Sequence, residues 1–230
     1  MSSVPTSLAQ KVRTEVLSLE GVTRFSPNRR FALIYSEGSP ADTVYFLESG
    51  LVKTYKRGAE SKEIILEIVT PGGLFGLQAI ASDRQCHLSA EILVEGELFL
   101  IPRNVFLEYC DSRPGMWRLI AEVVLAGKHH LEKTIELLCT QEVEYRVLYF
   151  MAELAETVGS VVEGHECSIP LSQGELACLI GATRETTSSA LNALSRRGLV
   201  RLGRRQLVVP SIANLRKAAF ERITPSAPAV

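Results

Sequence analysis

Arg184 and Glu185 stand side by side near the start of GATRETTSSALNALSRRGLV, residues 181–200, and their hydrogen-bonding chemistry is opposite. A guanidinium presents a rigid fork of donors, whereas a carboxylate only accepts hydrogen bonds. The residues that follow are small and polar, and leucines return beyond them at helical spacing. The stretch therefore predicts a helix that presents one strong donor, one strong acceptor and several hydroxyl groups on a shallow face.

The basic residues of the chain gather around this helix. Between Gly181 and Arg222 there are nine Lys or Arg and only two acids, although the net charge of the 230-residue chain is −1. The rest of the chain must therefore carry a net charge of −8. This asymmetry favours a polyanionic partner for the basic end, and the alternative is a solvated basic helix without a partner.

The segment around Arg184 has the pattern of a helix-turn-helix followed by a hairpin. Ser172 and Glu175 are placed as the capping box of a first helix, and Thr183 is placed to cap a second one, over 183–197. A glycine between the two helices allows a sharp chain reversal, and LVRLGRRQLVVP follows as two short strands joined by a turn. This pattern predicts a winged helix-turn-helix, and the alternative is a helical hairpin with no ligand.

The residues of this segment suit recognition of double-stranded DNA. Arg184 can donate to O6 and N7 of a guanine, and Glu185 can accept from the N4 amino group of a cytosine. The predicted base-reading residues are Arg184, Glu185, Ser188 and Ser189. Polar groups near helix starts can bind phosphates, and arginines in the wing can displace counterions. The predicted phosphate and wing residues are Ser172, Gln173, Thr183, Thr186, Arg204 and Arg205.

The first half of the chain has the pattern of an antiparallel β structure. Residues 8–20 carry apolar residues at helical spacing and predict a short leading helix. Between residues 22 and 101, short segments rich in Val, Ile, Leu, Tyr and Phe are separated by turn signals such as EGSPAD, ESG, TPGG and EG. Six to eight short strands at nearly regular spacing predict an antiparallel sandwich or roll.

A long helix is predicted over RPGMWRLIAEVVLAGKHHLEKTIELLC, because apolar or small residues recur there every three or four positions. A stripe of this length favours packing against a twin helix in a homodimer, and the alternative is a helix that lies on its own domain. The predicted dimer contacts are Ile120, Val124, Gly127, Leu131 and Leu138.

Other function classes have little support in the sequence. The chain lacks GxSxG, HExxH and GxxxxGK[ST] motifs, so we do not expect an enzyme. The five cysteines form no CxxC pair, so no metal site is predicted, and neither Cys86-His87 nor His129-His130 is assigned a role. No apolar run reaches membrane-spanning length and the N-terminus lacks the apolar core of a secretion signal, so we expect no membrane association and a cytoplasmic location.

On these residues the chain resembles the CRP/FNR family of bacterial transcription regulators. Residues 34–80 resemble the family's cyclic-nucleotide-binding β-roll, and LSQGELACLIGATRETTSSALNALSRRGLV resembles its DNA-binding signature, of which TRETT is the most specific part. The resemblance implies a dimerisation helix at 115–139, base reading by Arg184 and Glu185, and RNA polymerase as a further partner. Ser189 stands where many members have an arginine.

The resemblance also implies an effector pocket, with Gly76, Leu77, Gln78, Leu88 and Ser89 at the corresponding positions. In cyclic-AMP-binding members, a Gly-Glu-Leu segment holds the ribose and an Arg-Ser-Ala segment holds the phosphate. Here these segments read Gly-Leu-Gln and Leu-Ser-Ala, so a buried phosphate would lack a cation. We therefore expect that the protein does not bind cyclic AMP in the usual way, and we predict no cofactor; the sequence does not identify the effector.

The predicted fold class is α+β. We expect an N-terminal antiparallel, jelly-roll-like β-roll at 1–112, a dimerisation helix at 113–140, a winged helix-turn-helix domain at 141–223 and a disordered tail at 224–230. The predicted function is a dimeric transcription regulator that reads a pseudo-palindromic DNA site. The alternatives are a ligand-binding or protein-interaction module without DNA function, and a haem- or redox-gated regulator.

Overall fold

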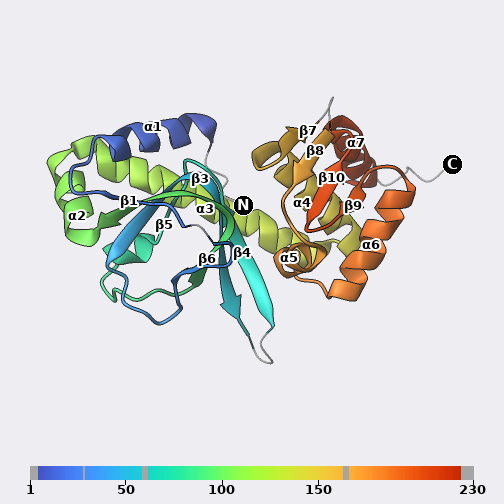
Figure 1. The fold of residues 1–230 in the computed structure, drawn as a ribbon, viewed down its shortest axis with the longest axis horizontal. Coiled ribbons are helices and arrows are strands. Elements are labelled where there is room, and N and C mark those ends of the chain that lie inside the picture. The colour runs from blue at the N-terminus through green and yellow to red at the C-terminus, as the bar shows by residue number, and fades with distance from the viewer. Residues whose placement is uncertain (1–4, 28, 59–61, 163–165, 224–230) are drawn as a thin grey trace. The chain divides into compact units, whose positions relative to one another are not determined.

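The computed structural model describes residues 5–27, 29–58, 62–162 and 166–223, so the predicted tail at 224–230 lies outside the described residues. The chain divides into two compact units, Met1–Lys133 and Thr134–Val230 (Figure 1). One helix, α3 (Pro114–Thr140), contributes residues to both units.

The first unit is built on an antiparallel sheet flanked by helices. Its elements before α3 are α1 (Thr6–Leu17), β1 (Thr23–Phe25), β2 (Leu33–Tyr35), β3 (Thr43–Arg57), β4 (Glu63–Val69), β5 (Leu74–Phe75), the 3-10 helix η2 (Leu77–Ile80), β6 (Ser89–Pro102) and α2 (Arg103–Ser112). The strand order is β1-β6-β3-β4, with β2 paired to β6 and β5 paired to β3. The predicted antiparallel β architecture is confirmed, whereas α2 was not predicted.

Two of the predicted turns are bulges inside long strands. Gly50 of the ESG signal lies within β3, and Gly96 of the EG signal lies within β6. Gly50 has a φ of +87°, and a Cβ atom added to it would lie 2.6 Å from the Val94 carbonyl oxygen. The two backbones thus approach too closely for a side chain at this point. The prediction of separate short strands was wrong here, because a glycine at a bulge resembles a glycine at a turn in the sequence.

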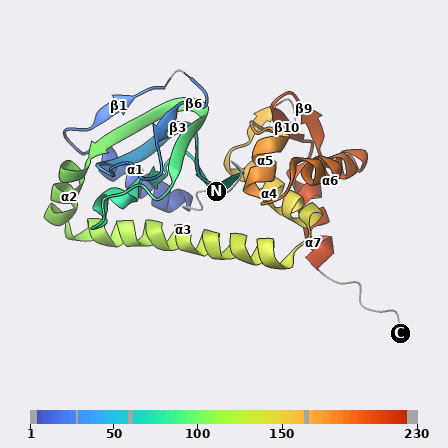
Figure 2. The same ribbon diagram turned by 90° about the horizontal axis from the view of Figure 1, so that it is seen from below.

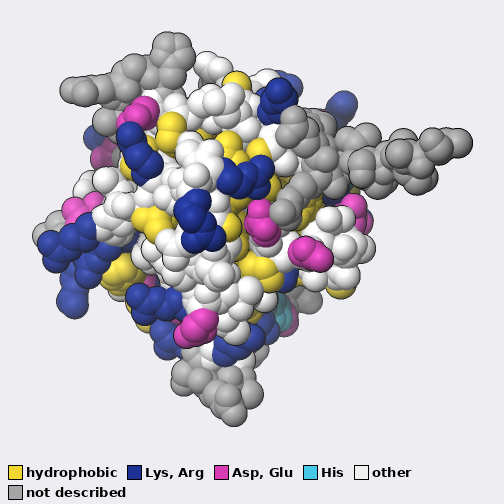
Figure 3. All heavy atoms as spheres, turned by 90° about the vertical axis from the view of Figure 1, so that its right-hand side faces the viewer, with side chains coloured by type: hydrophobic (Ala, Val, Ile, Leu, Met, Phe, Trp, Pro, Cys, Tyr) yellow, Lys and Arg dark blue, Asp and Glu magenta, His cyan; other side chains and the backbone are white. Residues whose placement is uncertain are grey.

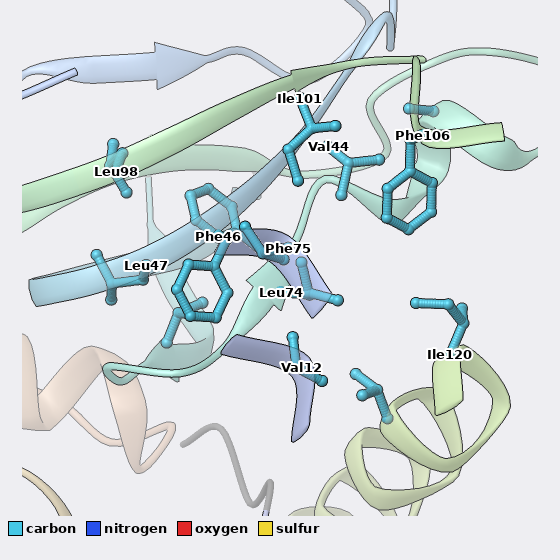
Figure 4. Packing of buried hydrophobic residues seen from close by; sticks show 14 of the residues in the cluster. Val12, Val44, Phe46, Leu47, Leu74, Phe75, Leu98, Ile101, Phe106 and Ile120 are labelled. Atoms are coloured by element: carbon cyan, nitrogen blue, oxygen red, sulfur yellow. The ribbon is translucent and has the colours of Figure 1, made fainter. Parts of the chain in front are cut away.

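Helix α3 closes the core of the first unit from one side (Figure 2). Figure 4 shows Ile120 of α3 pointing into the cluster that contains Phe106 of α2, Leu74 of β5 and Val12 of α1. Because Ile120 is only 3% exposed within its own chain, it is not available to a partner subunit. The prediction of Ile120 as a dimer contact was therefore wrong, since the side of α3 that carries it packs against its own domain.

A second side of α3 is apolar and exposed. Trp117, Val124 and Leu131 follow one another at intervals of seven residues, and Ile135 lies one turn beyond. Their exposed fractions are 39%, 50%, 44% and 51%. Gly127, which was predicted as part of the same stripe, is exposed, whereas Leu138, also predicted, is half-buried. We call Trp117, Val124, Leu131 and Ile135 the exposed stripe of α3.

The second unit combines a small sheet with helices. Its elements after α3 are α4 (Val143–Thr157), β7 (Ser160–Val162), β8 (Glu166–Ile169), α5 (Gln173–Leu179), α6 (Arg184–Arg196), β9 (Arg201–Gly203), β10 (Gln206–Val209) and α7 (Ile212–Ile223). The strands pair antiparallel in the order β7-β8-β10-β9. Helix α7 was not predicted. None of the helices in the described ranges is long and apolar enough to cross a membrane.

Candidate functional site

Helices α5 and α6 form the predicted helix-turn-helix, and their caps are made by the predicted residues. The Glu175 backbone N–H donates to Ser172 Oγ at 3.2 Å, and the Ser172 N–H donates to Glu175 Oε2 at 2.6 Å. This reciprocal pair completes the capping box of α5. Gly181 reverses the chain with a φ of +63°, and the Arg146 side chain of α4 donates to the carbonyl oxygen of Ile180 at 2.8 Å. The turn is thereby held both by its own glycine conformation and by a hydrogen bond from α4.

Thr183 caps α6 through its hydroxyl group. Thr183 Oγ1 accepts a hydrogen bond from the Thr186 N–H at 3.1 Å and lies 2.9 Å from the Thr186 hydroxyl oxygen. Both side chains are exposed. One of the two hydroxyl protons is used in the bond between them, so the other threonine can still donate to a phosphate oxygen without loosening the helix.

Helix α6 separates a buried side from a polar exposed side. Thr187, Leu191 and Leu194 are buried in the second unit. The exposed side carries the charged pair and two small polar residues: Arg184, Glu185, Ser189 and Asn192. Ser188 is half-buried at the edge of that side. The face that points to solvent is therefore shallow between the two long side chains of the first turn and Arg196 in the last turn.

Arg184 and Glu185 make no ion pair, either with each other or with another residue in the part of the chain that the structure describes. Other arginines of the basic segment are neutralised. Arg197 pairs with Glu144 at 3.3 Å, and acids from outside the segment also pair with Arg201 and Arg216. The sequence count of nine cations therefore overstates the charge offered to a partner. The exposed face of the second unit still carries many Lys and Arg side chains (dark blue in Figure 3).

The wing is a hairpin whose tip is Arg204 and Arg205. Gln206 pairs with Gly203 across the tip, and both arginines are exposed. Arg205 has a φ of +57°, in the left-handed region that Gly and Asn occupy at lower cost. Arg205 thus occupies a turn position where a bulky residue is conformationally unfavourable, next to the exposed Arg204.

A cavity of about 190 Å³ lies between the sheet and α3 in the first unit. Its lining residues are Thr54, Leu66, Glu67, Leu88, Gly127, His130 and Leu131. Of the five predicted pocket residues, only Leu88 is among them. Gly76 lies against the Tyr45 ring, and Leu77 packs on the apolar core. Ser89 Oγ accepts a hydrogen bond from the Glu37 N–H at 3.0 Å.

Gln78, the remaining predicted pocket residue, is half-buried, and its Oε1 atom has no hydrogen-bond partner in the described structure. Thr54, Glu67 and His130 line the cavity but were not predicted as pocket residues. Thr54 and Glu67 lie on two neighbouring strands and His130 lies on α3, so no single sequence motif brings them together.

The polar groups of this cavity favour their uncharged forms. Burial raises the pKa of the Glu67 carboxyl group, and burial lowers the pKa of His130 to about 4. The Thr54 hydroxyl is buried, and its oxygen lacks a hydrogen-bond partner within the described ranges. No Lys or Arg is among the cavity's described lining residues. The cavity is therefore better suited to an uncharged ligand than to a phosphate.

The histidine and cysteine pairs do not come together as a metal site. Cys86 is buried, with its Sγ 3.8 Å from the carbonyl oxygen of Pro40, whereas His87 is exposed and pairs with Asp83. His129 is exposed on α3. Across the described residues, no group of three or more His, Cys, Asp or Glu side chains could hold a metal ion.

Each of the two units is similar to a domain of known proteins. Residues 28–113 match the family model of the cyclic nucleotide-binding domain, and residues 145–218 match that of the Crp-like helix-turn-helix domain. The CRP-like cAMP-activated global transcriptional regulator of Mycobacterium tuberculosis is 27% identical over 187 residues, which cover 81% of this chain and 84% of that protein.

Two solved structures share the fold over most of the chain. The structure of FixK2 from Bradyrhizobium japonicum has a TM-score of 0.74 at 26% identity and covers 90% of this chain and 98% of its own. That of a CRP/FNR-family transcriptional regulator from Thermus thermophilus has a TM-score of 0.73 at 25% identity and covers 86% and 98%. With its cyclic nucleotide-binding-type domain and its Crp-like helix-turn-helix, the chain belongs to the CRP/FNR family of DNA-binding transcription regulators.

Proposed function

We propose that the protein acts as a homodimer that reads a pseudo-palindromic DNA site through α6. The observation that carries this proposal is the unpaired, exposed Arg184 and Glu185 on the first turn of a helix whose next two turns expose only small or polar side chains. Two copies of such a helix enter successive major grooves about one helical turn apart. Ser188 and Ser189 complete the base-reading set, with Ser189 replacing the longer arginine of many family members.

The exposed stripe of α3 supports the dimer. Apolar residues at seven-residue intervals pack against a second helix in a coiled coil, and the described part of the chain leaves 39–51% of each stripe residue exposed. Val124, Gly127 and Leu131 stay as predicted dimer contacts, and Trp117 and Ile135 join them. Leu138 extends the same spacing.

We further propose a working cycle for the regulator. A signal in the first unit shifts the population of dimers towards those whose reading helices are aligned with DNA, and α3 transmits it because its residues belong to both units. RNA polymerase is the partner expected of a family member, no catalytic step is expected, and the protein works in the cytoplasm with the DNA that it reads.

Replacing Arg184 by Ala should weaken specific binding by about 1–3 kcal/mol and relax the preference at one G·C pair in each half-site. The measurement is selection of sites from a random duplex pool, followed by titration of the enriched site and of random DNA. Arg197→Ala is the matched control, because Arg197 is held by Glu144. Selection of the same palindrome by both variants would refute base reading by Arg184.

Replacing Arg205 by Gly removes a cation and relieves the left-handed backbone. We expect weaker binding to specific and random DNA alike, with the slope of log K against log salt reduced by about one. The melting temperature should stay level or rise. Such a result would show that weaker DNA binding comes from the lost charge and not from a less stable fold. An unchanged salt slope would place the wing outside the DNA contact.

Val124→Arg places a charge in the exposed stripe, close to Lys128 on the same helix. We expect the dimer to dissociate in sedimentation experiments, because the new arginine of each copy would be buried in the contact without an acid to pair with. His129→Arg adds the same charge away from the stripe and should leave the dimer intact. A dimer that survives Val124→Arg would show that a different surface joins the subunits.

Cyclic AMP should not bind the cavity in the usual way, although the Mycobacterium tuberculosis relative is described as cAMP-activated. The reason is that Leu88 and its neighbours offer no cation for the phosphate. Calorimetric titration of the full-length protein should show no saturation up to about 1 mM. Micromolar binding at the first unit would contradict this expectation.

A further inference from the structure

A second cavity, of about 340 Å³, lies in the second unit between α4 and α7. Its lining residues are Tyr145, Tyr149, Ala152, Glu153, Glu156, Arg216 and Ala219. None of them belongs to α5, α6, β9 or β10, which carry the proposed DNA contacts. The volume is at the lower end of the range for small-molecule sites, which is roughly 300–1,000 Å³. The cavity therefore has room for a small ligand and is separate from the DNA-reading residues.

The cavity contains a carboxylate whose hydrogen bonding is incomplete. Glu153 Oε1 accepts a hydrogen bond from the Tyr149 hydroxyl at 2.8 Å. Glu153 Oε2 is buried and has no hydrogen-bond partner in the described part of the chain. Burial and the adjacent Glu153 carboxylate raise the pKa of Tyr149, so this tyrosine is a neutral donor at physiological pH. A buried carboxylate oxygen without a donor costs free energy that a bound donor would recover.

The cation at the cavity is already engaged. Arg216 of α7 pairs with Glu156 of α4. The Arg216 side chain is 56% exposed, so this ion pair stands where the cavity meets solvent. Glu153 is therefore left with one neutral donor, while two tyrosines and two alanines provide an aromatic and apolar wall.

We propose that this cavity binds a small organic cation, a primary amine or a guanidinium on a short apolar or aromatic body. The cationic group donates to Glu153 Oε2 and supplies the missing hydrogen bond and the missing charge. Tyr145 and Tyr149 line the cavity, and an aromatic ring next to a cation can attract it. The small side chains of Ala152 and Ala219 leave space for the ligand's body.

The test is calorimetric titration of the full-length protein with tyramine and with agmatine, with thermal melting as a second readout. At least one of the two should bind saturably and raise the melting temperature. The probe 4-ethylphenol has the ring of tyramine without its ammonium group, and it should bind about tenfold more weakly or worse than tyramine. The experiment needs no DNA, so its result does not depend on the proposed regulatory function.

Glu153→Gln should weaken amine binding about ten- to hundredfold, because it removes the charge and keeps an acceptor for Tyr149. Glu142→Gln removes the same charge from an exposed position at the start of α4 and should leave affinity unchanged. If Glu153→Gln fails to fold, Ala219→Leu fills the cavity from α7 and should abolish binding. The proposal is overturned if neither amine saturates, if 4-ethylphenol matches tyramine, or if both glutamine variants bind alike.

Discussion

Helix α3 has to bury apolar side chains on two of its sides at once. One side, with Met116, Ile120 and Val123, is buried in the core of the first unit. The other, the exposed stripe, is left 39–51% exposed by the described residues, and the proposed second copy would remove that apolar surface from water. The cavity between the sheet and α3 is lined by the same helix, through Gly127, His130 and Leu131. A shift of α3 therefore changes the cavity, the stripe and the start of the second unit together.

The sequence predicted the helix-turn-helix in detail because its signals are local. Caps such as Ser172 and Thr183 bond to backbone groups three residues away, and the buried side of α6 follows from helical spacing alone. The β-rich unit was predicted only in outline. Gly50 and Gly96 mark bulges where two distant strands meet, and that pairing leaves no trace in local sequence.

The residues that sequence reasoning missed are those assembled from several elements. Thr54 and Glu67 reach the first cavity from neighbouring strands and His130 reaches it from α3. The family resemblance implied Gly76, Leu77, Gln78, Leu88 and Ser89, of which only Leu88 lines the cavity. The ion pairs of Arg197, Arg201 and Arg216 were missed for the same reason, since their acids come from α4 and β8. Burial and charge pairing are properties of the folded chain, and a residue count cannot supply them.

These three ion pairs also bear on how the protein searches for its site. With Arg197, Arg201 and Arg216 engaged, the proposed DNA contacts draw their cations from the first turn of α6 and the tip of the wing. Cations that are held in ion pairs release fewer counterions on random sequence, so non-specific encounters are briefer than they would be if all the cations of the segment were free. Pairing of these arginines thus favours rapid sampling of non-specific DNA by the protein. Long residence is expected only at the sites where Arg184 and Glu185 find matching bases.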